Sequence, residues 1–496
     1  MSKKILIMLV AVVTGAFMAS VAMAVDYGDL GFNTRLATSG KTAGTILNPE
    51  GKGDALLAAY YDVRVVNGKT QDTYFAIINE NMDAIPHNGV AAKLRFREWD
   101  KSEEVFDIDI WMSDNDVWVG TLTRNPANGL TRITSPDYVI TNDSVPAGTF
   151  TVSKTTVVST GFDFFTDFVP GGTLNSVLPP SGFTSADLTN MGYFEIIGEE
   201  RTYTKPSTTT APILVTRFGA GELDCLNSLS AYVYIVRVDD GVSLGYNADA
   251  IANFNRQSIV SLYSGPGAPS PSLNNCEDGL DQLEFEISKA RVYHGYSIED
   301  NINAKFSHII TFPTKHFHFE KHTPKRLDYT ICATVGGNGC ITIGAPFTGA
   351  TANTGEEVAP KIYDRDENPF TPESGFWSPR TTPTISLPFE VNVIGLYKGS
   401  PPSVPLQGNR NNVAFSTGTP GFQTGWMWID LFHNTLGAGV HFAATRSDPF
   451  FGHLGNRFTG YTGMPALSLV LQEFSNANVG GAYGVIFPSF YRLDWL

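Results

Sequence analysis

The sequence predicts an all-β protein made of tandem immunoglobulin-like β-sandwich domains with long loop excursions. Three observations favour this fold. Apolar residues recur with a period of two in several segments, 48 glycines and 29 prolines supply many turns, and only 17% of the residues are charged. The segments between residues 56 and 125 show no sustained helical period. We therefore expect many short strands joined by turns.

A β-hairpin is the clearest element of the first half. Apolar and polar residues alternate over 90–97 and again over 106–111, and the polar segment 99–104 separates the two runs. Such alternation is typical of antiparallel strands with one buried and one solvated face. Neighbouring strands are expected at 60–66, 73–79, 117–122 and 232–238.

The polar face of this hairpin carries opposite charges on its two strands. Lys93, Arg95 and Arg97 alternate with apolar residues on the first strand. Asp107 and Asp109 do so on the second. Cross-strand charge pairs on the solvated face would fix the register of the two strands.

Composition divides the chain into domains. A Pro- and Ser-rich segment at 264–272 is the best linker candidate, and the segment 126–222 is rich in Thr, Ser, Pro and Gly, with one helical turn expected near 185–190. The predicted parts are a signal peptide 1–24, a first sandwich 25–265 with an insertion at about 126–222, a linker 266–279 and a second sandwich 280–496. Strands of the second sandwich are expected at 283–287, 306–312, 327–334, 341–343, 389–396, 425–431 and 466–474.

The first two dozen residues predict export. Lys3 and Lys4 precede an apolar run at 5–13, and Ala22-Met23-Ala24 matches the small-residue pattern that signal peptidase cleaves. We expect a secreted or cell-surface protein whose mature chain has no membrane span. The net charge of −15 at pH 7 would repel phosphates, so we expect no nucleic acid partner.

The four cysteines indicate two disulfide bonds in an oxidising compartment. Three pairings are open in principle. We favour Cys332–Cys340, because the glycine-rich segment between them suits a hairpin turn, and Cys225–Cys276 then follows.

Two clusters are weak candidates for metal ligands, and no metal or other cofactor is predicted from them. His316 and His318, two apart in a strand-like stretch, would point to one face, with His322 nearby, but adjacent lysines oppose a cation there. Asp107 and Asp109 carry oxygen ligands of the kind that calcium prefers, without the loop of an EF-hand.

Common catalytic motifs are missing from the sequence. It has no G-x-S-x-G, no H-E-x-x-H and no P-loop, although a glycosidase needs only two carboxylates that can lie far apart in sequence. Aromatic residues that could stack on sugars are Trp377, Trp426, Trp428 and Trp495.

Several short segments resemble a group of large secreted cell-surface proteins of Gram-negative bacteria. They include 93–98, 116–118, 309–317, 362–367 and 463–466. The resemblance implies a surface location and carries no catalytic residue.

We therefore expect a non-enzymatic surface protein, either an assembling subunit of a surface layer, matrix or filament, or an adhesin. Its partners would be further copies of itself or cell-surface components. A secreted carbohydrate-active hydrolase or carbohydrate-binding protein is the first alternative, and an outer-membrane β-barrel is the second.

Overall fold

The computed structural model confirms an almost entirely β protein with sandwich-like antiparallel sheets. The described residues are 45–66, 68–80, 89–142, 149–153, 164–169, 179, 182–202, 213–216, 227–254, 273, 280–320, 323–324, 329–332, 340–343, 347, 356–369, 385–397, 415–416, 423–431, 461–476, 481–492 and 494–495. Residues 46–496 form one compact unit. The predicted signal peptide lies outside the described residues.

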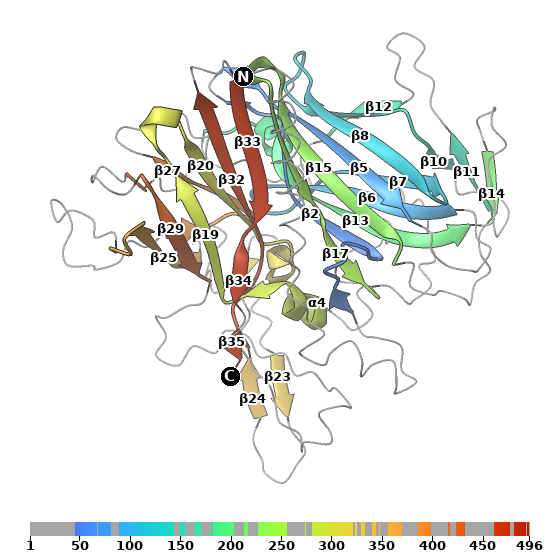
Figure 1. Cartoon of the computed structure of the whole chain (residues 1–496). Helices are drawn as coiled ribbons and strands as arrows, with labels where there is room; N and C mark the ends of the chain where they lie inside the picture. Colours follow the sequence, from blue (N-terminus) through green and yellow to red (C-terminus); the bar gives the residue numbers. More distant parts are fainter. Residues whose placement is uncertain are drawn as a thin grey trace. The chain divides into compact units, whose positions relative to one another are not determined.

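The first half of the chain forms a nine-stranded and a six-stranded sheet (Figure 1). In spatial order, the nine-stranded sheet contains β1 (Ile46–Leu47), β17 (Asp249–Ala252), β2 (Ala55–Asp62), β13 (Met191–Thr202), β6 (Gly89–Glu98), β7 (Glu104–Ser113), β10 (Val139–Asn142), β11 (Thr149–Ser153) and β14 (Ile213–Thr216). The six-stranded sheet contains β12 (Phe164–Asp167), β9 (Thr131–Ser135), β8 (Asp116–Arg124), β5 (Asp72–Asn79), β15 (Leu229–Arg237) and β16 (Val242–Asn247).

Aromatic side chains fill the space between these two sheets. Phe75 of β5 contacts Phe194 of β13, with ring centroids 5.0 Å apart, and Phe96 of β6 at 5.9 Å. Trp118 of β8 packs beside Phe75 on the same sheet. Each such ring buries a large apolar area, and the tilted and edge-on geometries suit the ring quadrupoles.

The predicted hairpin is present as β6 and β7, but its charged face is not solvated. Lys93 lies opposite Asp109 and Arg95 opposite Asp107, as predicted for the charge pairs. However, Lys93 and Arg95 are each only 3% exposed. The periodicity correctly separates apolar from polar residues, but it cannot report that chain distant in sequence covers the polar face.

The segment 126–222 contributes a central strand as well as the predicted helical turn. β13 pairs with β2 on one side and β6 on the other. The expected turn is α3 (Ser185–Thr189), where Thr184 and Asp187 form a reciprocal capping box.

The second half forms two five-stranded sheets. One contains β26 (Ile385–Leu387), β25 (Glu356–Asp364), β29 (Thr424–Asp430), β19 (Arg291–Ser297) and β34 (Phe490–Arg492). We call it the outer sheet. The other, the inner sheet, contains β28 (Phe415–Ser416), β27 (Val391–Tyr397), β20 (Lys305–Thr311), β32 (Leu467–Asn476) and β33 (Gly481–Pro488). Strands are antiparallel throughout except for the β27–β28 pair.

Short strand pairs and single helical turns complete the described chain. The pairs are β3 (Val65–Val66) with β4 (Lys69–Thr70), β18 (Ser288–Lys289) with β31 (Met464–Pro465), β21 (Phe319–Glu320) with β22 (Thr323–Pro324), β23 (Tyr329–Cys332) with β24 (Cys340–Ile343), and β30 (Tyr461–Thr462) with β35 (Asp494–Trp495). The 3₁₀ turns are η2 (Val238–Asp240), η4 (Asp300–Ile302) and η5 (Lys315–His318).

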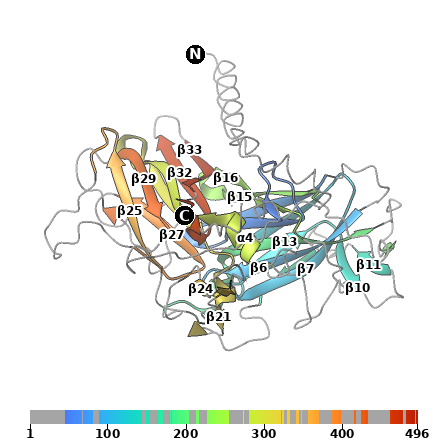
Figure 2. The ribbon, with the colours of Figure 1, turned by 90° about the horizontal axis from the view of Figure 1, so that it is seen from below.

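Both faces of the central strands β20 and β32 of the inner sheet are buried. Ile310 and Val470 join the core shared with the outer sheet, whereas Ile309, Leu469 and Leu471 join the core of the first half. The two faces of β20 therefore pack against different cores. Figure 2 shows β32 and β33 beside β15 and β16, where Arg237 and Glu473 form a buried ion pair of 2.5 Å.

The predicted strand at 283–287 is wrong, because these residues belong to the helix α4 (Leu280–Ile287). Leu280, Leu283 and Ile287 are all buried. Their spacings of three and four residues place them on one helical face. The apolar run is too short for its period alone to separate strand from helix.

The sheets divide where the linker was predicted, since no described strand of 46–252 shares a sheet with a described strand of 288–495. Leu273, inside the predicted linker, is fully buried in the core of the first half. The domain limits themselves stay a prediction. Among the described residues, no helix is long and apolar enough to cross a membrane.

Candidate functional site

The predicted histidine cluster does not form one face. Because η5 (Lys315–His318) is a 3₁₀ turn rather than a strand, residues two apart point in different directions. Nε2 of His318 lies 2.6 Å from Oε1 of Glu284 on α4. His316 instead lies near Arg95 and Arg97, and its burial is the main reason that its pKa falls well below the usual value.

The other candidate ligands are held by protein groups or lie elsewhere. The ammonium of Lys93 lies 2.7 Å from Asp107 and 3.0 Å from Asp109, so both carboxylates already pair with a cation of the protein. His322 is outside the described residues. Within the described ranges, no three His, Cys, Asp or Glu side chains gather as a metal site.

The predicted cysteine hairpin is confirmed at the level of the backbone. β23 and β24 pair antiparallel, and Cys332 lies directly opposite Cys340. Opposed residues of antiparallel strands have the Cα separation that a disulfide needs. The bond itself stays a prediction, and Cys225 and Cys276 lie outside the described residues.

A buried polar cluster joins the two halves of the chain. Nε of Arg97 lies 2.5 Å from Oε1 of Glu195, and the guanidinium also donates to the carbonyl of Ser102 at 2.8 Å. The hydroxyl of Tyr193 contacts the Ser102 hydroxyl at 2.9 Å and donates to the carbonyl of Pro313 at 3.1 Å. We call these residues, together with Glu98, Asp100, Lys315 and Glu390, the junction cluster.

Burial raises the pKa values of three carboxyl groups of the junction cluster, Glu98, Asp100 and Glu390. Burial raises the pKa of Glu98 to about 8, although backbone amides of the turn at 100–103 donate to its carboxylate. Burial also raises the pKa of Glu390 to about 8, opposed by the nearby charge of Lys315. Glu98 is 1% exposed and Glu390 is 4% exposed. These carboxyls therefore face protein rather than solvent.

A second buried polar group lies between the inner and outer sheets. Nε2 of His294 is 3.1 Å from Nδ1 of His308, and Nε2 of His308 is 2.7 Å from the hydroxyl of Ser468. That hydroxyl donates to Ser489 at 2.7 Å. Burial lowers the pKa of His294 to about 3 and that of His308 well below its usual value. Both rings are therefore neutral at physiological pH.

The outer face of the outer sheet carries four half-buried aromatic side chains. The rings of Tyr363 and Trp426 stack with their centroids 4.3 Å apart and their planes 7° apart. Trp428 lies 5.1 Å from each of these rings, and Tyr293 lies 6.2 Å from Trp428. We call Tyr293, Tyr363, Trp426 and Trp428 the aromatic face.

The strands place these four side chains together by alternation and register. Met427 and Ile429 of β29 point into the core, so Trp426 and Trp428 point outward. Trp426 is paired with Tyr363 of β25, and Trp428 with Tyr293 of β19. One side of β29 therefore collects aromatic residues from three neighbouring strands.

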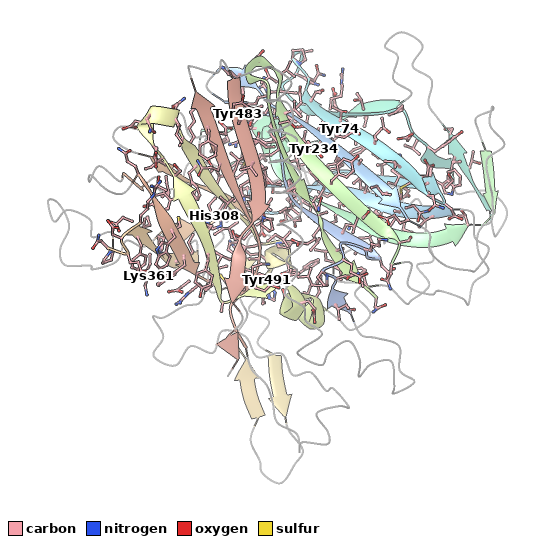
Figure 3. All side chains as sticks on the ribbon, in the orientation of Figure 1. Tyr74, Tyr234, His308, Lys361, Tyr483 and Tyr491 are labelled. Carbon is pink, nitrogen blue, oxygen red and sulfur yellow. The ribbon has the colours of Figure 1, made fainter. Side chains whose placement is uncertain are left out.

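Two cations and one carboxylate surround Trp428. The guanidinium carbon of Arg291 lies 4.8 Å from the ring centroid, and the ammonium of Lys361 lies 5.3 Å from it. Arg291 is paired with Asp430, whereas Lys361 approaches the same carboxylate only to 3.9 Å. The side chain of Lys361, labelled in Figure 3, is 42% exposed.

A group of tyrosines on the six-stranded sheet is arranged differently. Tyr234, which is labelled with Tyr74 in Figure 3, contacts Tyr74 with planes 40° apart and Tyr232 with planes 76° apart. None of these pairs is stacked, and no tryptophan belongs to them. The aromatic face thus differs from the tyrosine group in containing a stacked ring pair and two tryptophans.

The sequence pattern indicates Trp426 and Trp428 as candidate stacking residues but does not indicate their partners. Trp377 lies outside the described residues, and nothing is described for the side chain of Trp495. Tyr293 and Tyr363 alternate with buried residues in the same way as the two tryptophans. This alternation could have identified the two tyrosines as outward-facing. The sequence pattern does not show the strand pairing that places them beside the tryptophans.

Comparisons with known protein families, curated proteins and solved structures gave no match for this chain.

Proposed function

We propose that the protein is a secreted, non-enzymatic surface protein of the adhesin type, which binds carbohydrate through the aromatic face. The observation that carries this proposal is the cluster of Tyr293, Tyr363, Trp426 and Trp428 on the side of the outer sheet that points away from its core. The C–H faces of a sugar ring pack on aromatic rings, and the phenol and indole groups add hydrogen bonds at their edges.

The free-energy cost of leaving apolar rings in water supports a binding role for the aromatic face. Leaving apolar area in water costs about 25 cal/mol per Å², so a cluster of large rings on a sheet surface is unfavourable unless something covers it. Such patches on soluble proteins mark interaction sites. The nearby Arg291, Lys361 and Asp430 provide a polar edge of the kind that orients a ligand.

The buried carboxyls favour a binding protein over a hydrolase. A glycosidase needs two carboxyl groups on either side of the bond that it cleaves. Glu98 and Glu390 have the raised pKa values of candidate acids, but both are almost completely covered by protein. We therefore assign them to the junction between the two halves of the chain.

Export supports placing this binding surface outside the cell. The proposal of secretion rests on residues 1–24, which begin with positive charges, continue with an apolar run and end in a signal-peptidase cleavage pattern of small residues. An acidic chain stays soluble there, and its many strand pairs give a rigid scaffold for a binding face.

Binding to a panel of polysaccharides tests the proposal. Purified protein is mixed with insoluble glycans such as cellulose, chitin and pectin, and the bound fraction is measured. Trp426→Ala should weaken binding about fivefold to tenfold, because one stacked ring contributes roughly 1–1.5 kcal/mol. Tyr234→Ala, on the six-stranded sheet, is the matched control and should bind normally. Binding that is absent, or equally reduced in both variants, would contradict the proposal.

A further inference from the structure

An open position lies beside the stacked rings of the aromatic face. Tyr363 covers Trp426 from β25, and the residue opposite Trp426 on β19 is Gly295. Gly295 is exposed. An added Cβ at Gly295 would meet, among described atoms, only the carbonyl oxygen of Gly425 at 3.6 Å. No described side chain therefore occupies this position.

Packing does not explain this glycine. Gly425 must be glycine, because its Cβ would lie 1.9 Å from the carbonyl oxygen of Tyr363. Gly245, which lies opposite Tyr234, is covered by the tyrosine ring, whose nearest atom would be 2.4 Å from a Cβ. Gly295 has the same register relation to an aromatic residue, yet the Trp426 ring does not fold over it.

The dimensions of this space suit one further ring. Neighbouring strands lie about 4.8 Å apart, so a ring above Gly295 would continue the stack of Tyr363 and Trp426 by one strand spacing. β34 pairs with residues 291–293 of β19 only, so no described strand flanks Gly295 on its other side. The Trp426 ring therefore lies on one side of this space, and the strand backbone lies beneath it. On the other side, no described strand encloses it.

The charges at the Trp428 end of the aromatic face favour an anion. Among the described residues there, Arg291 and Lys361 share the carboxylate of Asp430, so this end carries two cations and one carboxylate. This contrasts with the net charge of −15 of the whole chain. Arg291 and Lys361 also flank Trp428, two residues along β29 from Trp426. An acidic group on a neighbouring sugar unit would therefore meet a cation.

We infer that the space above Gly295 is a subsite for a pyranose ring of a uronate-bearing polysaccharide. One sugar ring stacks on Trp426, and the carboxylate of a nearby unit contacts Lys361 or Arg291. This inference rests on the proposed carbohydrate-binding function and adds the ligand class and the residues that select it. The binding forms and breaks no covalent bond.

The test compares three soluble polymers by isothermal titration calorimetry. Polygalacturonate carries uronate carboxylates, galactan is its neutral counterpart, and dextran sulfate supplies negative charge on a different sugar. We expect polygalacturonate to bind at least about tenfold more tightly than the other two. Raising the salt concentration should weaken binding, because the contact of Lys361 is partly exposed.

Two substitutions examine the subsite and its charge separately. Gly295→Leu fills the space without removing any ring, and it should reduce polygalacturonate affinity at least about tenfold while the melting temperature stays unchanged. Lys361→Gln should reduce it about fivefold, the effect of one exposed charge pair. Lys52→Gln is the charge control, because Lys52 is partly exposed, pairs with the carboxylate of Glu80 and lies outside the outer sheet.

The outcomes separate this inference from the proposed function. Equal binding of galactan and polygalacturonate, lost in Trp426→Ala, would keep the carbohydrate-binding function and overturn the acidic subsite. Equal binding of dextran sulfate and polygalacturonate, unaffected by Gly295→Leu, would reduce the effect to general charge attraction and also overturn it. Binding of no glycan, here or in the wider panel, would overturn both.

Discussion

The backbone amide of Val391 donates a hydrogen bond of 3.0 Å to the carbonyl oxygen of Trp99, and this bond joins the two halves of the chain. The Trp99 ring also contacts Phe389, with centroids 4.8 Å apart and planes 79° apart. Trp99 directly follows the last residue of β6, whereas Val391 begins β27 of the inner sheet. The turn at 99–103 is therefore a docking element for the second half.

A shared core predicts that the two halves unfold together. Trp99→Ala should destabilise the protein by about 3–5 kcal/mol, the usual cost of removing a buried aromatic ring. Hydrogen exchange should accelerate equally in β6 and β27, because Val391 and Val393 of β27 belong to the same core cluster as the apolar residues of β6. Urea unfolding followed by mass spectrometry measures both strands at once.

The control for this experiment is Tyr483→Ala, because Tyr483 is 56% exposed. Its stability should stay within about 0.5 kcal/mol of the unchanged protein. Two separate transitions, with β6 opening before or after β27, would show that the halves are independent domains.

Local pattern predicts the strands well and their surroundings poorly. The run 106–111 alternates cleanly because one face meets an aromatic core, so its strand and register follow from the sequence. The polar face looks solvated from the same pattern. Its burial depends on residues such as His316, some 200 positions away, and no local period carries that information.

The candidate site could likewise be predicted only in part from the sequence. Trp426 and Trp428 are visible in the sequence as large aromatic residues in a strand, and the structure places them outward. Gly295 has no distinctive local signal, since an exposed strand glycine is common in a chain with 48 glycines. Its meaning comes only from lying opposite Trp426.

The opposed cysteines predict a disulfide in the mature protein. Peptide mapping without reductant should recover residues 332 and 340 in one linked fragment. Replacing both cysteines with serine should cost about 2.5 kcal/mol, the chain-entropy value for so short a loop, if no strain offsets it. Recovery of free thiols at both positions would contradict this pairing.

Because Glu390 is buried, we expect the stability of the folded protein to fall as the pH rises. Its pKa is about 8 in the folded protein against 4.5 as an ordinary value, so between these pH values the folded state binds the extra proton. Stability is therefore greatest below pH 4.5 for this group and is lost as pH rises through 8. Lys315 and Arg97 oppose the shift, whereas Asp100 adds to it.

Glu390→Gln should flatten the decline in unfolding free energy between pH 5 and pH 8. The slope should fall without vanishing, because Glu98 has the same raised pKa. Guanidinium unfolding at several pH values measures this slope. The exposed Glu50→Gln is the control, and a slope equal to that of the control would show that Glu390 is ionised in the folded protein.

Because His294 is buried, we expect it to make the protein lose stability as the pH falls. Burial lowers its pKa to about 3 from 6.5, so below pH 6.5 the unfolded chain binds a proton that the folded chain excludes. Stability from this group is present above pH 6.5 and is lost as pH falls.

His294→Phe should reduce that loss by up to about 1.4 kcal/mol per pH unit, the value for one proton. Urea unfolding between pH 5.0 and pH 7.0 measures it, with His308 still contributing its own proton. Phe306→Leu, beside His294 in the same core, should lower stability equally at every pH. Should both variants show the same pH slope, His294 would not be the group responsible.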